Sequence, residues 1–244
     1  MPNYQFAILS CVLLALCCPS AVQALGVTPL VLELSSGAAN RSAQIVVNND
    51  SAASTPIEIQ AFRAELDESG HDHLTRAPSD FIIFPPSKML APHSKQVFKV
   101  QWAGAPLARS QTYALLVDQL PVAMPNSTSG LQVVFNFEVI ANVSPPSGTR
   151  SLDVLSSSIV TVNGKRFASL LLSNAGNVHA KLSDANVTLQ SGSWSKLVGS
   201  ADLQQRLGVA IVQPGKKRRF VIPVELPAGA STVSAQISYE KTLR

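Results

Sequence analysis

Almost every segment of this chain alternates between apolar and polar residues with a period of two. Clear examples are residues 41–49, 55–66, 95–102 and 111–121, and turn-forming residues separate them. This period is typical of half-buried β-strands, and short strands at close spacing are typical of an antiparallel sandwich. In 55–66, for example, Ile57, Ile59 and Ala61 share one face. The helical period of 3.6 is almost absent, so we expect an all-β protein.

The stretch 144–149, with Pro145, Pro146 and Gly148, is the best candidate for a domain boundary. Two prolines and a glycine end a strand and stiffen a joint. A second set of strand-like segments follows it. Hydrophobic residues make up 46% of the 244 residues and charged residues 14%, which is enough for packed cores. We therefore expect two β-domains, at 25–146 and 147–244.

Residues 1–24 differ from the rest. The apolar run 6–18 is too short to span a bilayer, and small residues follow it at Val22 and Ala24. This pattern predicts a cleaved secretory signal peptide, with an uncleaved anchor as the alternative. Cys11, Cys17 and Cys18 all lie inside it. The predicted exported chain then has no disulfide and no cysteine nucleophile or ligand.

The sequence offers little to an enzyme. His71-Asp72-His73 could hold a metal ion, but a turn is expected there and a solvated loop is the better interpretation. No nucleophile elbow, zinc-protease motif or phosphate-binding loop is present. We expect no catalysis, cofactor or metal.

The basic run Lys216–Arg219 is interpreted as a charged strand entrance that discourages edge pairing, in preference to a membrane or nucleic-acid contact. With a formal net charge of only +4, we expect no nucleic-acid partner.

One strand candidate is unusually long. In 129–146, Leu131, Val133, Phe135, Phe137 and Val139 share one bulky apolar face. Strands are commonly five or six residues long, so the extra length needs an explanation. Either the strand spans its own core and runs on to the linker, or its first half is an edge that lends apolar side chains to another protein. The face with Val134 and Ile140 could then serve the domain's own core.

Residues 25–146 resemble the periplasmic chaperones of the chaperone–usher pilus pathway, the PapD-like family. The stretches that carry the resemblance are "LGVTPLVLELSSG", "IEIQAFRAELDESG", "FIIFPPSKMLAPHSKQVFKVQW", "SQTYALLVDQLPV" and "SGLQVVFNFEVIANVSPP", and "FASLLLSNAGNVHAKL" and "VQPGKKRRFVIP" extend it more weakly. The amino-acid sequence of these stretches is most similar to the archaic, Csu-like branch of the family. The resemblance implies two immunoglobulin-like domains arranged as an L around a cleft. It also implies a periplasmic protein that binds pilus subunits, passes them to an outer-membrane usher and needs no cofactor.

In that family the long strand completes the open core of a subunit. The resemblance therefore implies Leu131, Val133, Phe135 and Phe137 as donor residues. The best-known branch anchors a subunit carboxylate with two cleft cations, but Leu30 and Ile140 occupy those places here. A buried carboxylate still needs a cationic partner, and the candidates that we name are Lys99, Arg109 and Arg63.

An exposed apolar strand is compatible with self-association of the free protein, and the sequence leaves its oligomeric state open. The alternative functions are a structural pilus subunit or adhesin, or another secreted β-sandwich binding protein.

Overall fold

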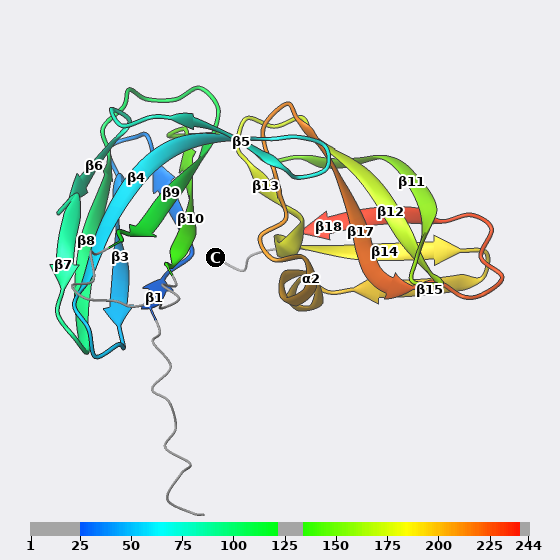
Figure 1. The fold of residues 1–244 in the computed structure, drawn as a ribbon. Coiled ribbons are helices and arrows are strands. Elements are labelled where there is room, and N and C mark those ends of the chain that lie inside the picture. The colour runs from blue at the N-terminus through cyan, green and yellow to red at the C-terminus, as the bar shows by residue number, and fades with distance from the viewer. Residues whose placement is uncertain (1–24, 122–133, 240–244) are drawn as a thin grey trace, which may run out of the picture.

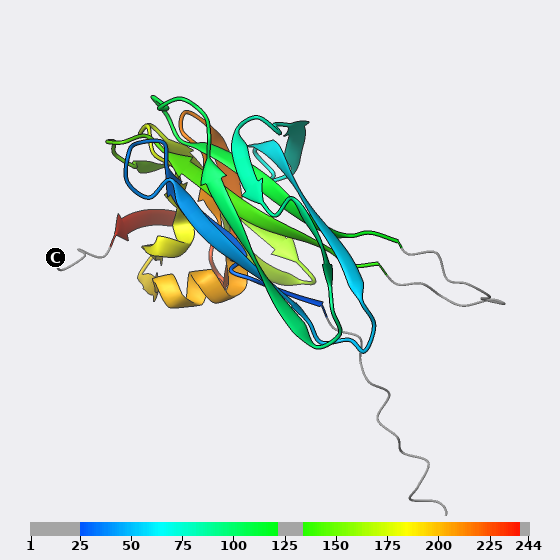
Figure 2. The same cartoon turned by 90° about the vertical axis from the view of Figure 1, so that its left-hand side faces the viewer.

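The computed structural model describes residues 25–121 and 134–239, and they form two β-sandwich domains that meet as the arms of an L (Figure 1). The chain passes from one domain to the other between Ser144 and Leu152. The prediction of an all-β, two-domain fold is confirmed. Figure 2, turned by 90°, views the molecule from the side of the N-terminal domain.

The N-terminal domain contains two sheets. The first has, in order, the strands β1 (Leu25–Thr28), β3 (Ser42–Asn49), β8 (Ser94–Trp102) and β6 (Phe81–Phe84). The second has β2 (Val31–Ser35), β10 (Asn136–Ser144), β9 (Gln111–Gln119), β4 (Thr55–Leu66) and β5 (Asp72–Arg76), with β7 (Ser87–Leu90) paired to one end of β4. The long second sheet faces the C-terminal domain.

The core of this domain lies between its two sheets. As predicted, Ile57, Ile59 and Ala61 of β4 are buried. An aromatic group closes one end: Phe81 meets the rings of Trp102 and Tyr113 edge to face, at centroid distances of 5.4 and 4.9 Å. Such pairs add about 0.5–1.5 kcal/mol beyond the burial of their area.

One expected strand proved to be two. The apolar stretch 27–34 has the pattern of one strand, but in the structure β1 ends at Thr28 and β2 begins at Val31. Pro29 has no N–H for a ladder, and the chain changes sheets at this point. β1 pairs with β3, whereas β2 pairs parallel with β10.

The C-terminal domain has one three-stranded sheet of β11 (Leu152–Val162), β12 (Lys165–Asn174) and β17 (Lys217–Glu225). A second has β15 (Trp194–Val198), β14 (Ala185–Ser191) and β18 (Ser234–Tyr239), and β13 (Ala180–Lys181) pairs with β16 (Ile211–Val212). Between these elements lie the 3₁₀ turn η1 (Leu182–Asp184) and the helix α2 (Ser200–Leu207).

Helix α2 was not predicted. It has eight residues, and only Leu203 on it is buried, so it shows no apolar stripe for a pattern search to find. Gly208 ends the helix with φ of 63°, a conformation that favours glycine. None of the helices in the described ranges is long and apolar enough to cross a membrane.

Candidate functional site

Strand β10 is paired along its whole length on one side but only in part on the other. It pairs antiparallel with β9 from Asn136 to Val143, and parallel with β2 only from Ile140 onward. The Ile140 N–H donates to the carbonyl of Leu30, just before β2, at 2.9 Å. Within the described ranges, no strand lies beside residues 136–139 on that side. We call this stretch the open edge of β10.

Backbone groups at the open edge are directed away from the sheet. Gln119 donates its N–H to the Phe135 carbonyl at 3.0 Å, so Phe135 and the odd-numbered residues after it bond to β9. Antiparallel alternation then points the N–H and C=O of Asn136 and Glu138 to the other side. An extended segment of a partner could therefore pair there without disturbing β9.

The face of β10 that meets the domain's own core is not the face that we expected. The odd-numbered residues face the domain's own core: Val139, Ala141 and Val143 are fully buried. Phe135 and Phe137 pack against this core as half-buried side chains, with their rings stacked at 6.4 Å. The expectation that Val134 and Ile140 serve the core is wrong, because they lie on the outer face. The predicted donor residues Leu131 and Val133 lie outside the described residues.

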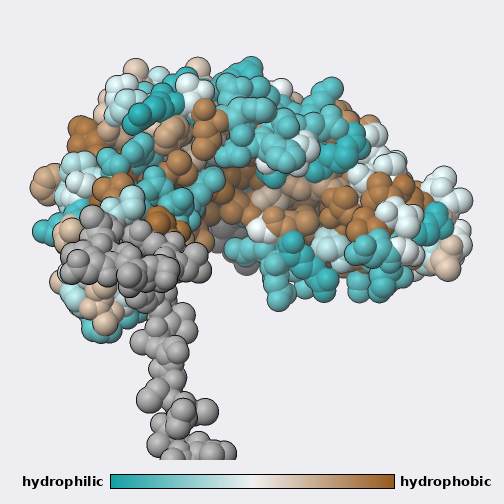
Figure 3. All heavy atoms as spheres, viewed as in Figure 1, coloured by the Kyte–Doolittle hydropathy of each residue, from teal (hydrophilic) through white to brown (hydrophobic). Residues whose placement is uncertain are grey.

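The outer face of the second sheet borders a cleft of about 260 Å³ between the domains. Leu66, Thr112 and Ile140 line it from the N-terminal domain, and Val209 and Ile211 line it from the C-terminal domain. Apolar residues gather in the recess where the two domains meet, as the space-filling view shows (Figure 3). The cleft lies on the same face as Ile140, where β10 leaves its open edge.

Three charged groups border this cleft. Burial raises the pKa of Glu138, and the nearby charge of Asp72 raises it further. Arg218 lines the opposite wall and donates from Nη1 to the Ile211 carbonyl at 2.7 Å. Its Nε is buried and has no hydrogen-bond partner in the described part of the chain. Burial lowers the pKa of Arg218, and the charge of Asp67 opposes that shift.

The basic run beside Arg218 fastens the two domains together. Lys216 Nζ lies 3.3 Å from Glu65 Oε2, and Arg219 Nη2 lies 2.6 Å from Glu68 Oε1. The Arg219 N–H also donates to the Glu68 carbonyl at 2.7 Å. The interpretation of the run as a charged strand entrance that discourages edge pairing is therefore wrong, because two of its cations bind the β4–β5 hairpin of the other domain.

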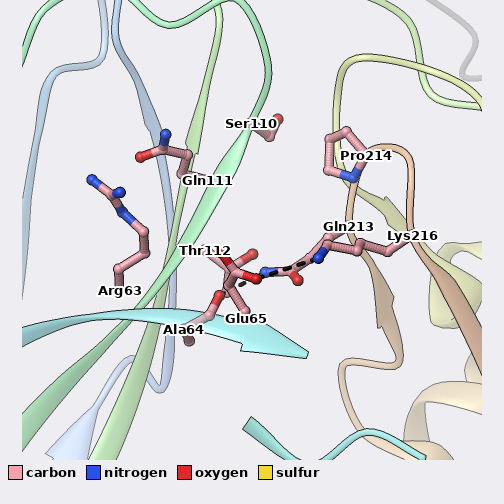
Figure 4. Close-up of a pocket in the computed structure, with 9 residues that line it drawn as sticks. All are labelled: Arg63, Ala64, Glu65, Ser110, Gln111, Thr112, Gln213, Pro214 and Lys216. Carbon is pink, nitrogen blue, oxygen red and sulfur yellow. Dashed lines mark hydrogen bonds and ion pairs between the residues drawn. The ribbon is translucent and has the colours of Figure 1, made fainter. Parts of the chain in front are cut away.

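Gln213 completes this joint from the C-terminal domain. It is buried, and its amide both donates from Nε2 to the Ala64 carbonyl at 2.7 Å and accepts at Oε1 from the Leu66 N–H at 2.9 Å. These backbone groups lie at and beyond the last pair of β4 with β9, at Ala64 and Thr112. Figure 4 shows Gln213 reaching Ala64 across a cavity of about 150 Å³. No sequence motif signals this contact.

The predicted anchor residues lie apart. Arg63 borders the cavity of Figure 4, and its Nη2 lies 3.0 Å from Asp80 Oδ2. Arg109 is exposed beside the loop at Gly215. Lys99 is exposed on β8 in the other sheet of the domain. None of the three lines the larger cleft of about 260 Å³. Their role as anchors stays a prediction, and Arg218 is a candidate that sequence reasoning missed.

The histidines considered as metal ligands lie at the β4–β5 turn. His71 is exposed, with Nδ1 2.7 Å from Ser69 Oγ and 3.9 Å from Asp67 Oδ2. His73 is exposed on β5, a strand that the alternating pattern does not predict. No group of three or more potential ligands is gathered anywhere in residues 25–121 or 134–239.

Comparison with solved structures shows the same fold in several fimbrial chaperones. The class 5 fimbriae chaperone CfaA superposes with a TM-score of 0.55 at 14% identity, over 88% of this chain and 98% of that one. A chain of the archaic CsuC–CsuE chaperone–tip adhesion subunit complex from Acinetobacter baumannii gives 0.54 at 14%, over 88% and 97%. The SafA pilin–SafB chaperone complex of Salmonella enterica gives 0.51 at 12%, over 90% and 98%.

No curated protein matches the chain significantly in sequence. A family model does match: the N-terminal domain of the PapD-type pili and flagellar-assembly chaperones aligns with residues 25–146, half of the chain. That range ends just after β10, and so includes the open edge. The chain therefore belongs to the family of pili and flagellar-assembly chaperones.

Proposed function

We propose that this protein is a periplasmic, non-enzymatic chaperone that holds pilus subunits by donor-strand complementation and delivers them to an outer-membrane usher. The observation that carries the proposal is the one-sided pairing of β10. Residues 136–139 offer backbone groups to a partner strand, and the alternating apolar residues of this strand candidate are Leu131, Val133, Phe135 and Phe137. Main-chain bonds give such a complex its register, and alternate side chains give it affinity.

The open edge can be tested by removing one backbone donor. In Asn136→Pro the lost N–H points away from β9, and proline is tolerated at the first residue of a strand. We expect the wild-type chain, co-expressed with a pilin-like subunit encoded beside it, to give a soluble 1:1 complex. Asn136→Pro should keep its fold by circular dichroism and lose at least about tenfold in affinity, the equivalent of one hydrogen bond of about 1.4 kcal/mol.

Asn136→Ala is the matched control, since it removes the side chain and keeps the N–H. It should bind like the wild type. Equal binding by Asn136→Pro would show that the open edge is not used. Failure of the wild type to bind any subunit would contradict the chaperone proposal, and polymerisation of the chain itself would mark it as a subunit.

We further propose that Arg218 supplies the cation of the cleft. Its guanidinium group lines the cleft, where a carboxylate or carbonyl oxygen of a bound subunit would accept a hydrogen bond from it. Hydrogen bonds to charged groups contribute about 1.5–3 kcal/mol. We expect Arg218→Met to weaken subunit binding about 10- to 100-fold in calorimetric titration, and Arg218→Lys to recover part of the loss. If Arg218→Met binds the subunit with unchanged affinity, Arg218 is not the cation that binds the subunit, and Arg63, Arg109 and Lys99 remain the candidates.

A further inference from the structure

A second open strand edge lies on the side of the N-terminal domain away from the C-terminal domain (Figure 1). Strand β6 is the last strand of its sheet and, within the described ranges, pairs only with β8. The Ala103 N–H donates to the Asp80 carbonyl at 2.9 Å, which fixes the phase of this ladder. Ile82 and Phe84 therefore bond to β8, and antiparallel alternation points the N–H and C=O of Ile83 to the free side.

The neighbouring edge of β4 is interrupted. Strand β7 covers residues 55–58 of β4 and β5 covers residues 62–66, which leaves residues 59–61 between them. The Ile59 N–H donates to the Pro86 carbonyl at 3.1 Å, but Pro86 has no N–H to return to the Ile59 carbonyl. The backbone is therefore incompletely paired here as well.

A cavity of about 350 Å³ opens between these two edges. Its apolar lining residues are Ile59, Ala61, Pro78, Phe81, Ile83 and Pro86. Successive side chains of a strand point to opposite faces. In a strand that paired with β6, one set of side chains would therefore point into the cavity. The other set would lie beside Ile82 and Phe84, which are 57% and 71% exposed.

Three exposed cations border this opening. Arg76 lines the cavity, Lys99 is the β8 partner of Phe84, and Lys88 follows on β7. None of the three belongs to an ion pair of the described residues. A partner that carries carboxylates would complement their charge.

The edge strand itself carries nothing that would repel such a partner. Its four residues, Phe81–Phe84, are uncharged, whereas exposed edges are commonly protected by charged side chains. The carboxylate just before it, Asp80, lies 3.0 Å from Arg63 Nη2 and accepts from the Tyr113 hydroxyl at 2.7 Å. Its charge is therefore already compensated.

We propose that the edge of β6 and the cavity beside it form a slot for an extended acidic segment of another protein, which pairs with β6 as an added strand. Ile83 exchanges backbone hydrogen bonds with this segment, an apolar side chain of the segment fills the cavity, and its carboxylates face Lys88, Lys99 and Arg76. This is recognition by β-strand addition. The slot belongs to a different sheet from the open edge of β10, so the proposal does not rest on subunit binding.

The probe that tests the slot is a fluorescent peptide of alternating leucine and threonine with a glutamate at each end. We expect the full chain to bind it in fluorescence anisotropy. A matched peptide with N-methylated leucines keeps every side chain but cannot donate to β6, because the residue opposite Ile83 shares its inward face. It should bind at least about tenfold more weakly, the equivalent of one hydrogen bond. A lysine-ended peptide should also bind more weakly.

Ile83→Pro removes one N–H that faces away from β8, a position where an edge strand tolerates proline. It should keep its fold by circular dichroism and bind the probe at least about tenfold more weakly than Ile83→Ala, which keeps the N–H. Lys99→Glu should weaken binding about three- to tenfold. Lys95→Glu, on the same face of β8 but roughly 13 Å away along the strand, should stay within about twofold of the wild type.

The open edge of β10 is the rival binding place, and Asn136→Pro separates the two. This variant should bind the probe like the wild type. Loss of binding in Asn136→Pro with full binding in Ile83→Pro would place the peptide on β10 and overturn the proposal. A wild-type chain that does not bind the probe, or that binds the N-methylated or the lysine-ended peptide equally well, would overturn it too.

Discussion

Val133→Glu/Phe135→Glu is expected to lose subunit binding by at least about 100-fold while the chain still folds. Both residues belong to the donor face that the sequence pattern predicts, where each apolar group buried in a subunit would contribute about 1.5–3 kcal/mol. Together they account for about 3–6 kcal/mol, or two to four powers of ten in affinity. Two carboxylates in an apolar groove add a desolvation cost. The measurement is co-purification from a co-expressing periplasm, followed by titration with purified subunit.

Val134→Glu is the matched control, because it adds a charge to the same segment on the opposite face. Val134 is already 38% exposed in the free chain, so we expect its substitution to leave binding within about threefold. Phe135 is half-buried against the core, and thermal unfolding of the double variant must show that the domain remains folded. Equal loss in Val134→Glu would show that strand parity does not decide binding, and would remove Val133 and Phe135 from the site.

Gln213→Glu is expected to uncouple the two domains. In the wild type the amide both donates to Ala64 and accepts from Leu66. A carboxylate keeps the second bond but sets a negative oxygen against the Ala64 carbonyl, which leaves a buried acceptor without its donor. Such a group costs about 1–3 kcal/mol, and more when it is charged. Scanning calorimetry should show the two domains of Gln213→Glu unfolding in separate transitions, with the C-terminal one lowered by roughly 5–10 °C.

Gln190→Glu makes the same chemical change at an exposed position on β14 and should leave the calorimetric profile unchanged. Gln213→Ala should give an intermediate effect, because it removes both bonds without adding a charge. Wild-type behaviour in Gln213→Glu would show that the ion pairs of Glu65 and Glu68 hold the joint without the amide.

Alternation predicts this fold well because strand formation and side-chain burial share a period of two. The bounds of β4 agree with the alternating segment 55–66, and those of β3, β8 and β9 lie within about two residues of the segments 41–49, 95–102 and 111–121. Alternation fails where the pattern is short or where the chain changes sheets. It missed the exposed strand β5 and the helix α2, and it ran β1 and β2 together across Pro29.

The site was harder to predict from the sequence. The alternation of odd- and even-numbered residues identifies the two faces of a strand, but it does not tell which of them meets the core. Phe135 and Phe137 were assigned to the donor face, and in the structure both side chains pack against the domain's own core. Their role as donor residues stays a prediction. The joint between the domains was not predictable. Glu33 and His179 are far apart in sequence, and only the folded chain brings them to 3.0 Å. The basic run was noticed, but its acidic partners are more than a hundred residues away.

The place where β2 begins gives the open edge its length. Because Pro29 separates β1 from β2, the parallel partner of β10 starts only at Val31, opposite Ile140. A strand that paired with residues 136–139, as we propose for a subunit, would therefore have to end beside Leu30. Moving this proline toward the N-terminus would let β2 grow over residues 136–139 and shorten the place left for a guest. The position of Pro29, near the start of the domain, would thus set the length of the open edge of β10, more than a hundred residues later in the chain.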